Sequence, residues 1–115
     1  LAAFYARLEA VISGRTVDVL AYEAPFVGRF PAAARSLYHY EAVILLFANR
    51  FGIPCVSRMP SDVKKSIGKG NASKEEVIAA MRELGHNPAD EHQADAMALL
   101  LMIQGDIMSH EEVSA

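Results

Sequence analysis

Apolar residues at the start of the chain recur at helical spacing. They are Leu1, Tyr5, Leu8 and Ile12. This pattern predicts an amphipathic helix that ends at Gly14, because glycine commonly follows the last helical residue. The chain opens inside this helix without an initiator methionine, and we expect that further sequence precedes it.

Two short segments have the composition of β-strands. Residues 17–22 are β-prone and lead to Glu23, and Pro25 prevents their continuation as an interior strand. Residues 53–57 form the second segment. Two strands make a poor sheet, so we expect further strands to come from upstream sequence.

A long apolar stretch separates these strands. Pro31 suits the first turn of a helix and Gly52 suits its end, which predicts one helix over residues 31–51. Its apolar side chains do not follow one narrow stripe; they include Leu37, Val43, Ile44, Leu46, Phe47 and Phe51. A helix with so broad an apolar surface needs more than one neighbour. We expect a sheet on one side and a second subunit on the other.

Three helices are predicted after the second strand. The first spans residues 60–67. The second follows Ser73, which forms a capping box with Glu76, and ends at Gly85. The third is capped by residues 87–90, with Pro88 as its first helical residue. Strands alternating with long helices indicate an α/β fold with a parallel pair of strands, in one domain over residues 1–115.

Composition narrows the class of protein. The chain is 52% hydrophobic and 22% charged, as in ordinary globular domains. Its longest apolar run, residues 96–103, is much shorter than the roughly 20 residues that span a bilayer. The single cysteine excludes an internal disulfide framework and a cysteine-rich zinc site. We therefore expect a cytoplasmic protein with no membrane partner.

Charges of opposite sign are separated along the chain. All four lysines lie within residues 64–74, while no lysine or arginine follows Arg82 and seven of the fourteen acids lie between Glu83 and Glu112. Such blocks suit a site that holds a polyanion together with its neutralising metal. Two solvated surfaces are the usual alternative, and composition alone does not choose between these interpretations.

Three acidic or imidazole side chains are candidates for chemistry. Glu23 ends a strand, where open α/β folds place ligands, although a surface turn is the commoner role for such a carboxylate. His92 and Asp95 are three residues apart on one helix, so they share a face. Acids near a helix start are often explained by the helix dipole. Asp95 fits that explanation poorly, because it lies in the second turn and directly precedes an apolar run.

Residues 60–74 mix lysines, glycines and small polar residues before a helix start. Backbone amides at a helix start attract phosphate, and lysines neutralise further phosphates along a DNA strand. The spacing of the glycines is not that of a Walker A loop. An exposed loop without function is an equally good interpretation of this segment taken alone.

Three blocks together resemble the RuvC-type Holliday-junction resolvases. They are residues 22–26 (YEAPF), residues 60–77 (PSDVKK…GNASKEEV) and residues 92–98 (HQADAMA). The resemblance implies a ribonuclease-H-like α/β fold, with a mixed β-sheet flanked by helices, that works as a homodimer. It also implies metal-dependent hydrolysis of phosphodiesters in four-way DNA junctions. Branched DNA is then the main partner, and branch-migration machinery is a further candidate.

The resemblance also assigns roles to individual residues. It implies that Glu23, His92 and Asp95 are catalytic and hold Mg²⁺ or Mn²⁺ in a two-metal site. Phe26 matches an aromatic that wedges against bases, and the helix from Pro31 matches the dimer-forming helix. The DNA-contacting region corresponds to Lys64, Lys65, Lys69, Asn71 and Lys74. Because imidazole suits Mn²⁺ better than Mg²⁺, His92 predicts a preference for Mn²⁺.

One residue of the family pattern is absent from the chain as given. The first catalytic residue of the family is an Asp in an Asp-x-Gly strand, and neither Asp18 nor Asp62 occupies that place in the motif order. We expect this strand upstream. Two alternatives remain open: a non-catalytic module for junction binding or dimerisation, and a different ribonuclease-H-like nuclease, such as a phage enzyme that acts on branched DNA.

Overall fold

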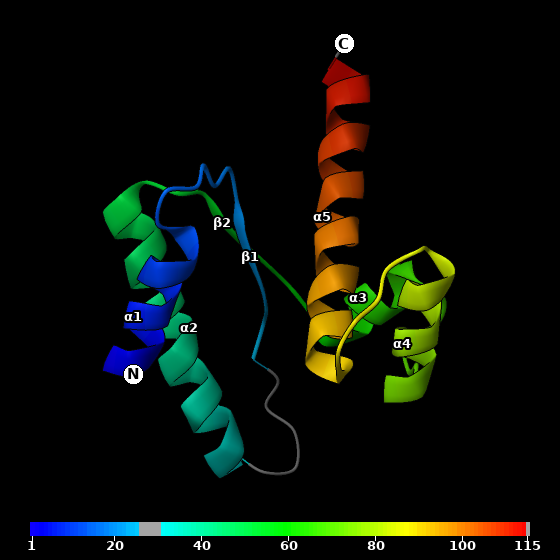
Figure 1. The fold of residues 1–115 in the computed structure, drawn as a ribbon, viewed down its shortest axis with the longest axis horizontal. Coiled ribbons are helices and arrows are strands. Elements are labelled where there is room, and N and C mark those ends of the chain that lie inside the picture. The colour runs from blue at the N-terminus through cyan, green and yellow to red at the C-terminus, as the bar shows by residue number, and fades with distance from the viewer. Residues whose placement is uncertain (26–30, 115) are drawn as a thin grey trace. The chain divides into compact units, whose positions relative to one another are not determined.

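The computed structural model describes residues 1–25 and 31–114, and the side chains of all of these except 31, 33 and 110–114. The elements follow in the order α1 (Ala2–Ile12), β1 (Leu20–Glu23), α2 (Pro31–Phe51), β2 (Cys55–Arg58), α3 (Pro60–Ser66), α4 (Lys74–Glu83) and α5 (Glu91–Ser114) (Figure 1). The chain divides into two compact units. Residues 1–20 and 24–57 form the first unit, and residues 21–23 and 58–115 form the second.

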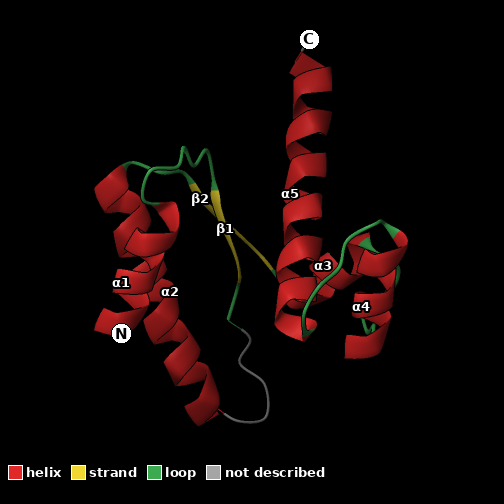
Figure 2. Ribbon diagram, in the orientation of Figure 1, coloured by secondary structure: helices red, strands yellow, loops and turns green. Residues whose placement is uncertain are grey.

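The two short strands form a two-stranded sheet (Figure 2). Helix α2 is the crossover between them, and the strands run parallel, as expected. Their limits differ from the sequence prediction: β1 begins at Leu20 rather than at residue 17, and β2 begins at Cys55 rather than at residue 53. The Leu20 N–H donates to the Pro54 carbonyl at 2.9 Å. The strands therefore begin where their backbones first meet, and the composition of one segment cannot fix that point.

In the first unit, α1 packs against α2. The fully buried Phe47 ring packs against the rings of Tyr5 and Phe51, at centroid distances of 5.3 and 4.8 Å. Arg50 donates to the Tyr5 hydroxyl at 2.6 Å. The bounds of α2 are those predicted, and its apolar surface is only partly covered. Its exposed apolar side chains include Leu37, Leu45, Leu46 and Phe51.

Gly52 ends α2 through a Schellman motif. Its φ of 65° is in the left-handed region that glycine adopts without steric cost. The Ile53 N–H donates to the Ala48 carbonyl at 2.9 Å, and the Gly52 N–H donates to the Asn49 carbonyl at 3.3 Å. These bonds satisfy carbonyls that the helix end would otherwise leave unpaired. The predicted role of Gly52 as the stop is confirmed.

In the second unit, α3 and α4 both pack against α5. The buried side chains of this core are Val63, Ala72, Val77, Met81, Ala94, Ala98, Leu99 and Ile103. Two of them on α5, Ala94 and Ala98, are small, so neighbouring helices can approach its backbone closely. This packing holds the first half of α5, which carries Asp95, at a fixed place in the unit.

The starts of α4 and α5 show one correct and one wrong prediction. The Ser73–Glu76 capping box of α4 is present. Helix α5 begins at Glu91, whereas Pro88 was expected to be its first residue; Pro88 is instead buried before the helix. The Asp90 carboxylate accepts the Gln93 N–H at 2.8 Å, so Asp90 is the N-cap and the helix starts directly after it.

None of the helices in the described ranges combines the length and the apolar character needed to cross a bilayer.

Candidate active site

Glu23 and Asp95 come together in the second unit. Glu23 is the last residue of β1, and Asp95 lies in the second turn of α5. Both side chains are half-buried. The charge of Asp95 acts on Glu23, so a strand end and a helix far apart in the sequence bring their carboxylates within electrostatic reach of one another.

The surroundings of Glu23 favour its protonated form. Burial raises the pKa of the Glu23 carboxyl above its usual value, the negative charge of Asp95 raises it further, and the ammonium of Lys64 lowers it. Two half-buried carboxylates that repel one another are a poor arrangement by themselves. A cation between them would remove the repulsion and offset the cost of burial.

Within the described part of the chain, the ammonium of Lys64 acts on the Glu23 carboxylate. Lys64 lies on α3 next to Val63, whose buried side chain anchors the helix. Lys64 itself is half-buried, and its charge reaches Glu23. We call residues 60–74 the basic segment. Its first lysine, Lys64, therefore belongs to the surroundings of the carboxylate pair.

His92 does not join this pair in the structure. Its side chain is 84% exposed, and its Nε2 lies 3.7 Å from Glu91 Oε1. Among the side chains that the structure describes, no three His, Cys, Asp or Glu residues form a group that could hold a metal ion. The oxygen donors of Glu23 and Asp95 are of the type that Mg²⁺ and Mn²⁺ prefer. The ligand roles of Glu23, His92 and Asp95 stay a prediction.

The predicted DNA-contacting lysines and Asn71 also lie in the second unit, on α3, in the segment that leads into α4 and at the start of α4. Two of the lysines form ion pairs: Lys69 Nζ lies 3.0 Å from Glu76 Oε2, and Lys74 Nζ lies 3.2 Å from Glu91 Oε2. Lys65 and Asn71 are exposed. Phe26, the predicted base wedge, lies outside the described residues.

A close approach in this segment explains one of its glycines. A Cβ atom on Gly70 would lie 3.0 Å from Lys65 Cε and 3.1 Å from Lys65 Cγ. Any larger residue at this position would therefore push the Lys65 side chain away. Gly70 lets the turn after α3 pass directly beside Lys65.

Sequence reasoning missed the acids that pair with the basic residues. Glu76 was recognised only as part of a helix cap, and Glu91 was not singled out, yet each binds a lysine of the predicted DNA region. Arg58 likewise pairs with Asp106 of α5 at 3.2 Å. The segregation of charge along the chain was the available signal, but it did not indicate which residues pair.

Comparison with known proteins identifies the family. The family model described as crossover junction endodeoxyribonuclease RuvC matches residues 1–102. The chain belongs to the RuvC family. RuvC of Parvibaculum lavamentivorans is 34% identical over 113 residues, which cover 96% of this chain and 65% of that protein. RuvC of Chloroherpeton thalassium is 33% identical over 81 residues, which cover 70% of this chain and 44% of that protein.

Solved RuvC structures have the same fold. Thermus thermophilus RuvC superposes with a TM-score of 0.70 at 30% identity, covering 85% of this chain and 61% of that chain. The same protein in complex with a Holliday junction substrate gives a TM-score of 0.73 at 29% identity, covering 85% of this chain and 62% of that one. These matches confirm the RuvC resemblance and the ribonuclease-H-like α/β fold. The chain spans less than two thirds of the length of each of these relatives.

Proposed function

We propose that the protein cleaves four-way DNA junctions by metal-dependent hydrolysis of phosphodiester bonds. One observation supports this proposal most strongly: in a RuvC-family chain, the half-buried Glu23 carboxylate lies within electrostatic reach of Asp95 and of Lys64. Paired carboxylates can hold divalent cations that assist the hydrolysis of a phosphodiester bond. A basic segment next to them suits the polyanionic backbone of DNA. The related Thermus thermophilus RuvC has been solved with a Holliday junction substrate.

In this proposal Glu23 and Asp95 hold the divalent ions, and His92 is a further ligand. Such ions, when bound, stabilise charge on the attacking and leaving oxygens of the phosphodiester. We propose that the protein prefers Mn²⁺ to Mg²⁺, because the imidazole of His92 suits Mn²⁺ better. Glu23 must be ionised to bind a cation, and the positive charge of Lys64 favours that ionised form.

The basic segment binds the DNA backbone. Lys64, Lys65, Lys69 and Lys74 contact phosphates together with Asn71, and the affinity falls steeply as the salt concentration rises. Phe26 stacks on an unpaired base at the junction centre, a contact of about 1–3 kcal/mol in other single-strand binders. The charged residues of this set lie on the unit that carries Glu23 and Asp95.

A homodimer completes the proposal. Helix α2 exposes large apolar side chains, with Leu46 63%, Leu37 49% and Leu45 46% exposed. A second copy of the chain that packs on this surface would bury it. The two-fold axis of such a dimer would give two equivalent active sites, so that two opposed strands of a junction can be nicked. Family membership is also the basis for proposing branch-migration machinery as a partner.

The test compares DNA substrates. Full-length protein is incubated with a four-way junction, a three-way junction, a flap and a linear duplex of matched sequence, in Mg²⁺ and in Mn²⁺. We expect paired nicks in opposed strands of the four-way junction and little cutting of the duplex. Junction binding without cutting in either metal would instead identify a non-catalytic binding module. Preferential cutting of the flap or three-way junction would identify a different nuclease for branched DNA.

A further inference from the structure

Two of the four lysines in the basic segment are already engaged by carboxylates. Lys69 pairs with Glu76 at 3.0 Å, and Lys74 pairs with Glu91 at 3.2 Å. Both lysines are among those proposed to bind DNA phosphates. A DNA phosphate that approaches either ammonium therefore finds a carboxylate already paired with it.

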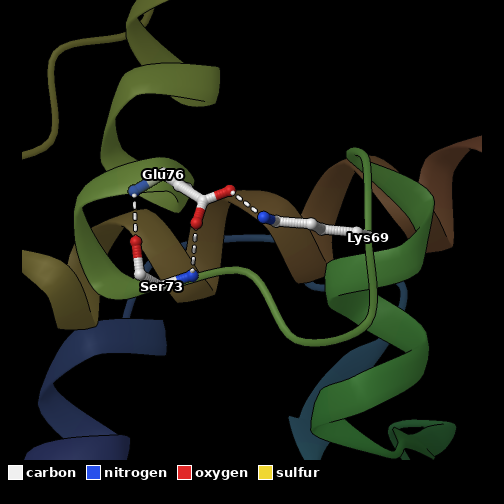
Figure 3. Close-up of polar contacts among 3 residues, drawn as sticks. All are labelled: Lys69, Ser73 and Glu76. Carbon is white, nitrogen blue, oxygen red and sulfur yellow. Dashed lines mark hydrogen bonds and ion pairs between the residues drawn. The ribbon is translucent and has the colours of Figure 1, made fainter.

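The carboxylate of Glu76 holds two donors at once. Its Oε1 accepts the Ser73 backbone N–H at 3.4 Å, and its Oε2 lies 3.0 Å from Lys69 Nζ (Figure 3). A backbone N–H at a helix start and a lysine ammonium are the kinds of donor that bind a phosphate. Glu76 therefore occupies the position that a phosphate of the DNA backbone would take on these two groups.

The helix cap prepares this carboxylate for the ion pair. The Ser73 hydroxyl accepts the Glu76 N–H at 3.2 Å, which together with the Oε1 contact closes the capping box. An ordinary surface ion pair loses stability because two long side chains must be ordered. Here the cap already orders Glu76, so only Lys69 loses freedom. Lys69 and then Ser73 hold the pKa of Glu76 below its usual value, so the competing charge is present at neutral pH.

The second pair joins the basic segment to α5. Lys74 is the first residue of α4, and Glu91 is the first residue of α5. Glu91 is less exposed than its partner, with 33% of its side chain accessible against 72% for Lys74. The two pairs therefore follow one principle: an acid at a helix start holds a lysine that is otherwise free to bind phosphate.

We propose that Glu76 and Glu91 are intramolecular competitors of DNA phosphates that set the affinity of the basic segment. This inference rests on the proposed function. DNA binds the segment by exchange: a phosphate displaces each carboxylate from its lysine. Each acid then lies unpaired beside the DNA, which lowers the affinity and speeds release.

A charge-matched pair of variants tests the competition at Glu76. Glu76→Gln removes the negative charge but keeps the capping box, because glutamine serves equally well at this position. Glu75→Gln makes the same change of net charge in the same helical turn, and Glu75 has no ion pair within the described residues. The dissociation constant for a four-way junction is measured at one fixed salt concentration. We expect Glu76→Gln to bind roughly two- to fivefold more tightly than Glu75→Gln, the range set by one surface ion pair.

A double-mutant cycle with Lys69 separates direct competition from a general field effect. In a Lys69→Gln background no ammonium is left for Glu76 to occupy, so adding Glu76→Gln should give no more affinity than adding Glu75→Gln. Glu91→Gln with and without Lys74→Gln repeats the cycle at the second pair. A circular dichroism melt of each variant checks that the fold is kept.

The outcomes distinguish this inference from the proposed function. A gain for Glu76→Gln that disappears without Lys69 supports the competition. Equal affinities for Glu76→Gln and Glu75→Gln, or a gain that persists without Lys69, overturn it, even if the wild-type protein binds and cuts junctions normally. Absence of junction binding by the wild-type protein overturns both the competition and the proposed DNA-binding function.

Discussion

Burial raises the pKa of Glu23 and the charge of Asp95 raises it further, although Glu23 ends a strand and Asp95 lies on the last helix. Without a bound metal ion, this pair works against the stability of the fold, because burial and the charge of Asp95 both disfavour the ionised form of Glu23. Such a cost is typical of a functional site, where the residues are chosen for chemistry rather than for stability.

The first prediction concerns stability in the absence of metal. Because folding raises the pKa of Glu23 above its ordinary value of 4.5, the folded protein binds the proton more tightly than the unfolded chain. The free energy of unfolding should therefore fall as pH rises from about 4.5 through the raised pKa. Glu23→Gln removes this loss, and we expect its Tm at neutral pH, in a chelator, to exceed that of the wild type by about 2–5 °C.

Asp95→Asn should act in the same direction, because it removes the repulsion from the other side. Glu75→Gln is the control, since Glu75 is exposed and its charge is not among those that shift the pKa of Glu23. A Tm for Glu23→Gln below that of the wild type at neutral pH would show that the Glu23 carboxylate stabilises the metal-free fold, contrary to this account.

The second prediction concerns the start of α5. Asp90→Ala should lower the free energy of unfolding by about 0.5–2 kcal/mol, because the Gln93 N–H loses its acceptor at the N-cap. Asp90→Asn keeps the cap and should cost little. Urea unfolding followed by circular dichroism measures both variants, and equal losses for Ala and Asn would show that Asp90 acts by its charge rather than as a cap.

Local signals predicted the helices well. Pro31 and Gly52 gave the bounds of α2, and Ser73 with Glu76 gave the start of α4. Each of these signals acts within one turn of the residue that carries it, so it is present in the sequence whatever the rest of the fold does. Pro88 was misinterpreted as the first helical residue because the Asp90 carboxylate, two residues nearer to the helix, forms the cap.

Features that depend on a distant partner were not predictable in detail. The start of β1 depends on where Leu20 meets Pro54. The meeting of Glu23 with Asp95 followed from family resemblance, whereas the effect of Lys64 on Glu23 came only from the packing of α3. The Lys69–Glu76 and Lys74–Glu91 ion pairs do not join residues of a single helix. The spacing of residues along a helix therefore does not predict them.

The third prediction uses two neighbouring residues of α2. Phe47 is fully buried, and Leu46 is 63% exposed. Phe47→Ala should cost about 3–5 kcal/mol of stability through the cavity it leaves. Leu46→Ala should keep the far-UV circular dichroism spectrum and weaken self-association. Sedimentation velocity measures the association, and an unchanged dimer with Leu46→Ala would place the dimer interface elsewhere.

The fourth prediction concerns the choice of metal. If His92 is a ligand, its side chain must turn away from Glu91, and its imidazole then favours Mn²⁺. We expect junction cleavage by the wild type to be faster in Mn²⁺ than in Mg²⁺, and His92→Asn to reduce that ratio by about tenfold or more, as expected for lost coordination support. A ratio that is unchanged in His92→Asn would exclude His92 from the metal site.

The most direct measurement compares junction binding and junction cleavage by full-length protein in the wild type, Glu23→Gln and Asp95→Asn. Both substitutions keep the size of the side chain and remove the charge that would hold a cation. We predict that each variant binds the four-way junction at least as tightly as the wild type, while its cleavage rate falls by about three orders of magnitude, the upper end of the ~10²–10³-fold loss from one electrostatic contact. Cleavage by either variant at close to the wild-type rate would contradict the assignment of Glu23 and Asp95 as the catalytic pair.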